Sequence, residues 1–430
     1  MLQKDYDVIV VGGGPSGLMA AIAAQTSGAR TLILEKGNKL GRKLAISGGG
    51  RCNVTNAKPL AELMKNIPGN SRFLTSALHA FGNEHIREFF EGLGIRLKEE
   101  DRGRVFPVSD KASTVVQALI NQIHRLGVTI ELNTPVLELV VNPAPSTIIG
   151  VKLDNHIIVH SPSVIVATGG CSVPQTGSTG DAYPWARAVG HTIISPYPTE
   201  VPLTSDAPFI QQRAVQGISL KDVNVQIINH KGKILTTEEG DLLFSHFGLT
   251  GPVALRCSHY VSTSKRQNPH GSLLARIDLL PSLTEQTLVD HFHRYRQNNG
   301  GRLVRTIAAQ WLPERLVDLI LDRSQIGRDQ ELAQLRKNAL QHLTDQIKRF
   351  VVPITGTLPL EKATVTGGGV SVREIDPKTM GSKHCLGLYF AGEAIDVHAH
   401  TGGYNITVAF STGHAAGLAA ANYSLSVPRS

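Results

Sequence analysis

Three glycines near the N-terminus have the spacing of a phosphate-binding turn. Gly12, Gly14 and Gly17 fit the pattern G-x-G-x-x-G and lie between an apolar run and an alanine-rich segment. In such a turn the first glycine permits a tight bend, the second lets the backbone approach a pyrophosphate, and the third lets a helix pack on a strand. The N-terminus of that helix would present free N–H groups and a partial positive charge to the phosphates. The spacing therefore predicts a dinucleotide site.

An acidic residue follows at the position where a ribose would lie. Thr31–Leu34 is predicted as the second strand, and Glu35 comes directly after it. A carboxylate there can accept hydrogen bonds from ribose hydroxyls. Glycine-rich turns alone are common, whereas a strand, a turn, a helix, a second strand and an acid in this order are far more specific.

The segment after this unit favours FAD over a nicotinamide dinucleotide. Residues 40–56 are glycine-rich and basic, and include Gly41-Arg42-Lys43 and Ser47-Gly48-Gly49-Gly50-Arg51. We interpret the segment as an ordered loop that passes closely along an extended cofactor, with a flexible surface loop as the alternative. A nicotinamide dehydrogenase would instead carry its catalytic groups in a separate, later domain.

The C-terminal part offers a second half of the same site. Gly392 and Glu393 follow a short apolar segment, and Asp396 comes three residues later, where many flavoproteins hold the ribityl chain. Ordinary helix capping is the alternative role for these two acids. Gly402-Gly403-Tyr404-Asn405 then opens a helix, whose N-terminus would stabilise negative charge at the flavin edge. The Asn405 side chain is expected to hydrogen-bond the flavin ring.

Prolines mark a change of domain in the middle of the chain. The stretch Ser195–Pro208 contains four prolines, which is typical of a crossing between domains. Strand-like and then helical patterns follow, and short strands ending in glycine return from about residue 356. The pattern predicts an α/β protein whose FAD-binding domain is split into residues 1–195 and 356–430, with residues 196–355 inserted.

Composition limits the remaining classes. The net charge is +8 and the pI about 9.3, but the basic residues are spread along the chain, so an enzyme for anionic cofactors is favoured and a nucleic-acid partner is unlikely. No apolar stretch is long enough to span a membrane, and the N-terminus does not resemble a signal peptide, so a cytoplasmic location is expected. The four cysteines form no C-x-x-C pair; free thiols and no metal site are expected.

Seven segments together resemble a bacterial flavoprotein family described as aminoacetone-oxidase-like, or as related to a flavin-dependent bile-acid enone reductase. They extend from Gly12 to Thr407 and read GGGPSGLMAA, NKLGRKLAISGGGRCNVTN, GRVFPVSDKAS, VPQTGSTGDAY, HFGLTGPVALRCS, TGGGVSVREID and GLYFAGEAIDVHAHTGGYNIT. The resemblance implies a Rossmann-like, three-layer FAD domain with an inserted β-rich, barrel-like domain and a small helical part.

The resemblance also implies a set of FAD contacts. They are Gly12, Gly14, Pro15, Ser16, Gly17, Glu35, Lys36, Arg42, Lys43, Ser47, Gly48, Gly50, Arg51, Asn53, Val136, Ala167, Thr168, Gly169, Gly392, Glu393, Gly402, Gly403, Tyr404, Asn405 and Ile406.

The catalytic acid or base is not identified by any motif. His246, Tyr404 and Arg104 are the candidates, the first because imidazole titrates near neutral pH. We expect hydride transfer between flavin N5 and a small organic substrate, either an amine or a conjugated ketone. Oxygen as acceptor and NAD(P)H as transient reductant both stay open, as does the oligomeric state. The alternative function is an RNA-associated flavoprotein related to tRNA-modifying enzymes.

Overall fold

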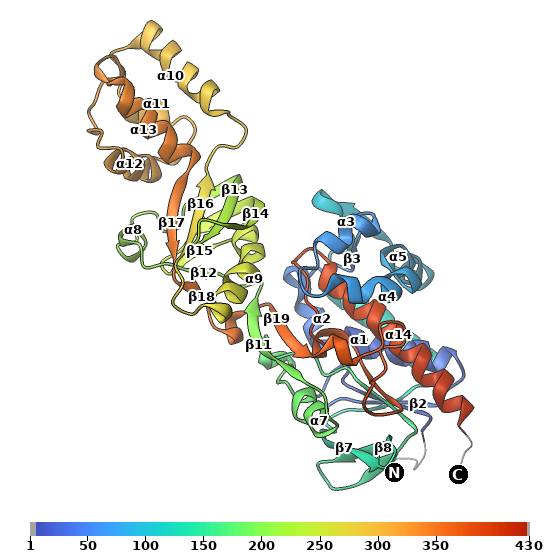
Figure 1. Cartoon of the computed structure of the whole chain (residues 1–430). Helices are drawn as coiled ribbons and strands as arrows, with labels where there is room; N and C mark the ends of the chain where they lie inside the picture. Colours follow the sequence, from blue (N-terminus) through green and yellow to red (C-terminus); the bar gives the residue numbers. More distant parts are fainter. Residues whose placement is uncertain (1–5, 428–430) are drawn as a thin grey trace. The chain divides into compact units, whose positions relative to one another are not determined.

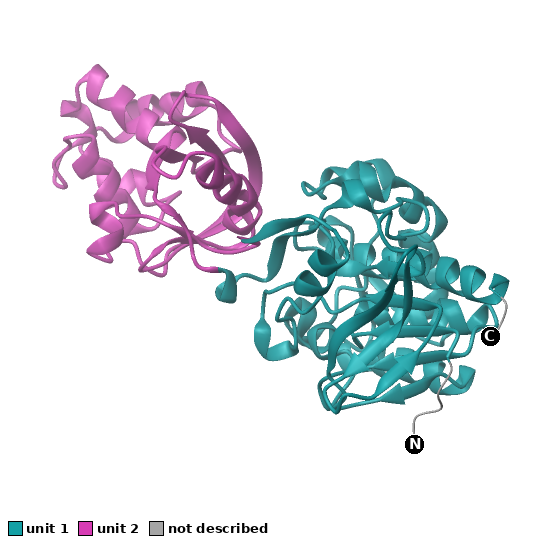
Figure 2. Ribbon diagram, turned by 60° about the horizontal axis from the view of Figure 1, so that its bottom comes forward, with its two compact units in different colours: residues 1–197, 360–430 teal, residues 198–359 magenta. Residues whose placement is uncertain are grey.

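The computed structural model describes residues 6–427 and divides the chain into two compact units. Unit 1 comprises the chain up to Tyr197 and from Leu360 onward, and unit 2 comprises Pro198–Pro359 (Figure 2). The composition change near Ser195 lies two residues before the first crossing. Each unit has its own hydrophobic core, because no buried cluster of the described residues contains side chains from both.

The centre of unit 1 is a five-stranded parallel sheet with the order β20-β10-β1-β2-β6. All neighbouring strands run parallel. The predicted Rossmann-like class is therefore confirmed. The strands are β1 Val8–Val11, β2 Thr31–Leu34, β6 Thr129–Glu131, β10 Ser163–Val166 and β20 Leu388–Phe390.

The sheet is the middle of three layers. Successive side chains of a strand point to opposite faces of the sheet, and each face packs against a different layer. Val8 and Val10 join the core formed with three helices, whereas Ile9 and Val11 join the core formed with an antiparallel meander. The helices are α1 Pro15–Thr26, α6 Ala112–Leu126 and α14 Tyr404–Ser426, and the meander strands are β7 Val136–Pro143, β8 Ser146–Leu153 and β9 Ile158–His160 (Figure 1).

Helices α1 and α14 pack with their backbones almost in contact. A Cβ atom on Gly413 would lie 2.2 Å from the Ser16 carbonyl oxygen, and one on Gly417 would lie 2.2 Å from that of Ala20. Four residues further along α14, the contact also lies four residues further along α1. The two helices therefore run parallel, and their N-termini point the same way.

The segment 40–56 is not the continuous loop that its composition predicts. It forms the short helix α2 Arg42–Ile46, a 3-10 turn at Ser47–Gly50 and the strand β3 Thr55–Asn56. The helix is only five residues long, too short for a periodic pattern to reveal it. The other elements of unit 1 are α3 Leu60–Lys65, α4 Thr75–Ala80, α5 Asn83–Gly92, β4 Leu97–Glu100, β5 Arg104–Pro107, α7 Ala182–Ala188, β11 Ile193–Thr199 and β19 Val365–Val370.

Unit 2 is built on a seven-stranded antiparallel sheet with the order β17-β16-β13-β14-β15-β12-β18. The two edge strands of this sheet, β17 and β18, are consecutive in the chain, and only Thr355 separates them. The sheet must therefore curl until its two edges come together at this point. Such a curl agrees with the expected barrel-like domain. The strands are β12 Leu203–Thr204, β13 Ser219–Asn229, β14 Ile234–Phe244, β15 Gly248–Thr250, β16 Leu273–Asp278, β17 Phe350–Ile354 and β18 Gly356–Thr357.

Helices complete unit 2. The helical pattern over residues 303–323 forms two helices, because Pro313 interrupts it. The helices are α8 Pro208–Gln211, α9 Pro252–Gln267, α10 Glu285–Asn299, α11 Val304–Ala308, α12 Glu314–Arg323 and α13 Lys337–Lys348. Within residues 6–427, no helix has both the length and the apolar character needed to cross a membrane.

Candidate functional site

A cavity of about 610 Å³ lies in unit 1 at the carboxyl ends of the parallel strands. Val11 of β1, Leu34 of β2 and Ala167, the residue after β10, all line it. Residues in the first turns of α1 and α14, among them Pro15, Ser16 and Asn405, line it as well. Ligands of open α/β sheets bind at this edge, where strands end and helices begin.

The three glycines of the turn have different surroundings. Gly12 has a φ of +108°, and a Cβ atom there would lie 2.5 Å from the Ala167 carbonyl oxygen. A Cβ atom on Gly17 would lie 1.9 Å from the Gly12 carbonyl oxygen. Gly14 has an ordinary extended backbone, and apart from its neighbours in the chain no described atom lies within 4 Å of its Cβ position. The first and third glycines are thus required by packing, whereas the second leaves space that belongs to the cavity.

Two helix N-termini meet the cavity at different depths. Gly413 of α14 lies beside Ser16 of α1, and α14 begins nine residues earlier, at Tyr404. Because Ser16 is the second residue of α1, the offset is eight residues, and at 1.5 Å per residue the N-terminus of α14 projects roughly 12 Å beyond that of α1. Neither helix has an acidic residue in its first turn. Both partial positive charges are thus left for a long, anionic ligand.

Glu35 is held at the cavity wall by backbone amides. Its Oε2 accepts a hydrogen bond of 2.7 Å from the Gly13 N–H, and its Oε1 accepts one of 2.7 Å from the Gly37 N–H. Each carboxylate oxygen keeps further capacity to accept a hydrogen bond. The geometry suits a diol that donates to this carboxylate.

A half-buried ion pair lies in another part of the lining. Lys43 donates to Glu393, and the other Glu393 oxygen accepts from the Thr366 N–H at 2.7 Å and the Ser172 hydroxyl at 2.9 Å. Burial raises the pKa of Glu393, but the Lys43 ammonium and these hydrogen bonds outweigh it, so the pKa lies below its usual range. Glu393 is therefore a carboxylate whose hydrogen-bond donors are already on the protein.

Further cations line the cavity. Lys36 pairs with Asp181 at 2.6 Å, and the Arg42 guanidinium donates to the Gln175 carbonyl at 2.6 Å. Lys39 also lines the cavity, and its side chain is exposed. The lining thus carries four cations and three carboxylates, which together with the two helix N-termini favours an anion.

Two buried polar atoms of the lining have no hydrogen-bond partner among the described residues. They are Asn53 Oδ1 and Thr168 Oγ1. Because leaving such atoms unpaired in the interior costs about 1–3 kcal/mol each, a polar ligand is expected to satisfy them. Volume, charge, helix N-termini and unpaired atoms all fit FAD.

Most residues expected to contact the cofactor line this cavity. They are Gly12, Gly14, Pro15, Ser16, Glu35, Lys36, Arg42, Lys43, Ser47, Gly48, Asn53, Val136, Ala167, Thr168, Gly169, Glu393, Gly402, Gly403, Asn405 and Ile406. The lining does not include Gly17, Gly50, Arg51, Gly392, Asp396 or Tyr404.

The structure gives several of these six another role. Arg51 turns away from the cavity after the left-handed Gly48–Gly50 turn and pairs with Glu100 and Asp110. Tyr404 is buried in the core on the meander side of the sheet.

Asp396 and Gly392 also contact protein rather than the cavity. The Asp396 carboxylate accepts a 3.0 Å hydrogen bond from Asn70. A Cβ atom on Gly392 would lie 2.4 Å from the Ser16 hydroxyl, so this glycine serves the packing of α1.

The Asn405 side chain does not match its expected role either. Its amide group donates to the Ala399 carbonyl at 2.7 Å and accepts from the Ala399 N–H at 2.8 Å. It therefore shapes the loop before α14, and only the backbone at this position is left to face a ligand.

The other two catalytic candidates lie outside the cavity lining. Arg104 pairs with Asp101 on the β3-β5-β4 sheet, and its guanidinium lies over the Phe106 ring. His246 belongs to unit 2, where it is exposed in the turn between β14 and β15.

One stretch of the lining was not assigned any contact from the sequence. It is the segment from Val173 to Trp185, of which Thr176, Gly177 and Ser178 line the cavity. Its motif VPQTGSTGDAY is one of the segments that support the family resemblance, so the sequence did single it out. No general rule for dinucleotide binding, however, predicts a cofactor contact for this motif. Trp185, at the end of this segment, is buried and lines the cavity as well.

Known proteins match the chain over nearly its whole length. The family model described as "HI0933-like protein Rossmann domain" matches residues 6–419. A ribosomal RNA dihydrouridine synthase of Escherichia coli K12 is 31% identical over 419 residues, which cover 95% of this chain and 96% of the relative. A 3-dehydro-bile acid delta(4,6)-reductase of Clostridium scindens is 29% identical over 415 residues, covering 96% and 98%.

Solved structures agree with the fold. The 3-ketosteroid delta1-dehydrogenase of Sterolibacterium denitrificans matches with a TM-score of 0.54 and 14% identity, covering 98% of this chain and 100% of that one. At this identity the similarity concerns the fold alone. The family match and the cavity geometry together lead to one conclusion: the chain belongs to the HI0933-like family and is an FAD-dependent oxidoreductase.

Proposed function

We propose that this enzyme reduces a carbon–carbon double bond conjugated to a carbonyl group, with NAD(P)H as the reductant. The observation that carries the proposal is the full-length similarity to two relatives whose names both describe the saturation of such a bond. An amine oxidase, which the sequence leaves open, is the competing activity.

The cavity residues are proposed to hold FAD along its length. The α1 N-terminus with Gly14 binds the pyrophosphate, and the Glu35 carboxylate accepts from the ribose hydroxyls. When bound, FAD supplies a ring that accepts a hydride from the reductant and delivers it to the substrate carbon. The α14 N-terminus at Gly403 would place its partial positive charge beside the flavin ring.

A proton must reach the second carbon of the double bond for the reduction to balance. The proposed donor to be tested is His246, the candidate selected from the sequence, because an imidazole can act as a general acid and this side chain is exposed. His246→Gln is expected to lower kcat by about 10²–10⁴-fold without releasing FAD. Unchanged turnover in this variant would remove His246 from the mechanism.

Anaerobic stopped-flow spectroscopy tests the reaction class. NADPH is expected to bleach the flavin absorbance rapidly, and a conjugated ketone such as a steroid enone, or a uridine-containing RNA, is expected to restore it faster than dissolved oxygen does. Bleaching by amines, followed by rapid recovery in oxygen, would show an amine oxidase instead.

The double bond to be reduced could belong to a free small molecule or to a uracil base in RNA. A basic surface of unit 2 favours RNA. Arg302, Arg336 and Lys337 are exposed in unit 2, and none has an ion-pair partner among the described residues. Leu332 donates to the Arg302 carbonyl, which brings the segment before Arg336 beside Arg302. Such a cluster can neutralise phosphates.

Charge reversal distinguishes the two sources. Arg302→Glu/Arg336→Glu/Lys337→Glu is expected to weaken binding of ribosomal RNA and to flatten its salt dependence, while reduction of a small ketone is unchanged. The matched control is Lys221→Glu/Lys231→Glu/Lys233→Glu, which makes the same charge change at exposed positions around β13 and β14. Equal RNA binding in both variants would favour a small-molecule substrate.

A further inference from the structure

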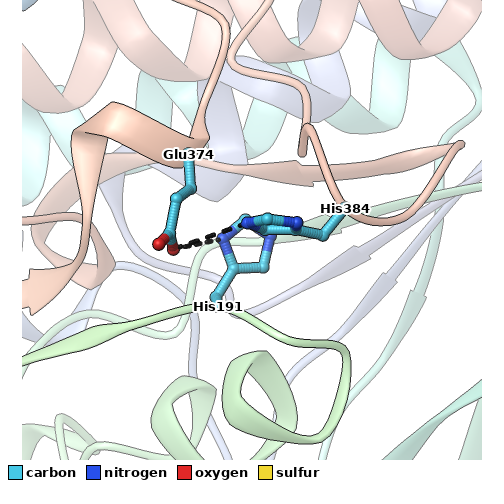
Figure 3. Close-up of side chains that lie close together, drawn as sticks. All are labelled: His191, Glu374 and His384. Atoms are coloured by element: carbon cyan, nitrogen blue, oxygen red, sulfur yellow. Dashed lines mark ion pairs between the residues drawn. The ribbon is translucent and has the colours of Figure 1, made fainter.

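Two histidines and a glutamate gather in unit 1 outside the cavity lining. His191 precedes β11, Glu374 ends the 3-10 turn Val372–Glu374 after β19, and His384 lies in the loop before β20 (Figure 3). Among the described residues they form a cluster whose nitrogen and oxygen atoms all lie within 4.8 Å of one another. The His191 Nδ1 atom is 3.4 Å from Glu374 Oε2, and the His384 Nε2 atom is 3.8 Å from the same oxygen.

The His191 ring is held in place, but only one of its two nitrogen atoms has a hydrogen-bond partner among the described residues. Its side chain is fully buried, and its Nε2 contacts the Ser382 hydroxyl at 2.6 Å. The ring packs edge-on against Phe390, with centroids 5.0 Å apart. Its Nδ1 atom, which faces Glu374, is buried and has no hydrogen-bond partner among the described residues. A nitrogen left this way in the interior is unfavourable, so a partner is expected at this point.

The Glu374 carboxylate is fixed from the opposite side. Oε2 accepts from the Thr192 N–H at 2.7 Å, and Oε1 accepts from the Thr192 hydroxyl at 2.8 Å. The residue next to His191 therefore orients the oxygen that faces His191. His384 differs from both, because it is exposed on a surface loop and can adjust.

We propose that His191, Glu374 and His384 bind a divalent transition-metal ion of the zinc class. Zinc–nitrogen and zinc–oxygen bonds of about 2.0–2.2 Å in a tetrahedron place neighbouring ligand atoms roughly 3.3–3.5 Å apart. The His191–Glu374 distance of 3.4 Å already matches. The His384 Nε2 atom, 3.8 Å from the same carboxylate oxygen and within 4.8 Å of the His191 nitrogen, must move closer to both. A water molecule would complete the tetrahedron.

The donor set selects the kind of ion. Two imidazole nitrogens and one carboxylate suit zinc, cobalt or nickel, whereas magnesium and calcium prefer oxygen ligands alone. A ligating histidine commonly donates its second ring N–H to a neighbouring oxygen, which is the relation of His191 Nε2 to the Ser382 hydroxyl.

The site has a structural position rather than a catalytic one. β11 and β19 form the two-stranded ribbon through which the chain leaves for unit 2 and returns, and β20 is an edge strand of the parallel sheet. An ion bound here would link the base of that ribbon to the sheet edge, so it is expected to stabilise unit 1 without altering the flavin.

Zinc titration of the full-length, tag-free, FAD-loaded protein after dialysis against EDTA tests the proposal. Isothermal titration calorimetry is expected to show one zinc per chain, with a rise in melting temperature that magnesium does not reproduce. X-ray absorption at the zinc edge is expected to show two imidazoles and no sulfur ligand.

Variants assign the binding to these residues. His384→Ala and Glu374→Gln should each weaken zinc binding at least about tenfold while keeping the flavin absorbance. His124→Ala, at an exposed histidine of α6, is the matched control and should bind zinc as the parent does. The proposal is overturned if no one-to-one binding occurs, if both ligand variants keep the parent affinity, or if the bound zinc has a sulfur ligand.

Discussion

The three glycines of the turn between β1 and α1 have different roles. Gly12 and Gly17 are required because a side chain would overlap backbone atoms 2.5 and 1.9 Å away, whereas a Cβ atom on Gly14 would meet only open space. The Gly14 carbonyl accepts a 2.9 Å hydrogen bond from the Leu18 N–H, which any residue at this position can accept in the same way. Gly14 can therefore be tested without disturbing the fold.

Gly14→Val is expected to fold normally and to bind FAD at least about tenfold more weakly, a loss of 1.4 kcal/mol or more. Its extended backbone accepts any residue, and the new side chain would occupy the space left for the pyrophosphate. The ratio of flavin to protein absorbance measures the loss. Gly92→Val, at another position with open space, should keep its FAD. A fully loaded Gly14→Val protein would contradict the proposed turn.

His414 makes stability depend on pH. Its ring stacks on Phe81 with centroids 4.2 Å apart, and burial, helped by His85, lowers its pKa from 6.5 to about 4. The unfolded chain then takes up the proton first, so this contribution is complete above pH 6.5 and is lost as the pH falls toward 4. Because the ring is only partly buried, we expect a loss of about 1–2 kcal/mol.

Urea unfolding between pH 7 and pH 4.5 measures this slope. His414→Gln should flatten it, whereas His124→Gln, at an exposed position on α6, should leave it unchanged. An equally steep slope in His414→Gln would assign the acid sensitivity to other groups.

At the scale of elements, the site depends on how closely α1 and α14 approach. Their parallel contact at Gly413 and Gly417 sets the offset between the two N-termini that face the cavity. A side chain at either glycine would push the helices apart and change this offset. Stability and cofactor binding should therefore fall together.

Gly417→Val is expected to destabilise unit 1 by about 1–3 kcal/mol and to release FAD. Its Cβ atom would lie 2.2 Å from the Ala20 carbonyl oxygen, a backbone atom that cannot rotate away. The urea midpoint and the flavin absorbance report the two effects. Leu418→Ala, at the exposed neighbour, serves as the control. Destabilisation without loss of FAD would show that the offset does not matter.

Local patterns predicted the elements whose signals lie close together in sequence. The unit from β1 to Glu35 was foreseeable because its strand, turn, helix and acid each follow a short-range rule. The direction of a side chain is harder to foresee, since it depends on backbone angles and distant neighbours. Arg51 leaves the cavity for this reason, because three left-handed glycines precede it and Glu100 lies within reach. Likewise no spacing rule could join His191 to Glu374, which are 183 residues apart.

At the scale of the whole molecule, unit 2 is an insertion with an independent core. Replacing Pro198–Pro359 by a short glycine–serine linker should leave a folded, yellow unit 1, because all lining residues of the cavity belong to unit 1. Substrate reduction should be lost with the proton donor proposed in unit 2. Absorbance and turnover assays separate the two results, and a colourless product would show that unit 1 needs the insert to fold.

Both sequence segments of unit 1 line the same cavity, and this determines when FAD can bind during translation. On the ribosome, Gly17 and Ala409 are synthesised roughly 20–80 s apart at about 5–20 residues per second. During that interval the nascent chain has the turn after β1 but lacks α14, so it cannot yet retain FAD. A polypeptide that stops before α14 should stay colourless, and the yellow colour of a preparation thus reports that translation has passed this helix.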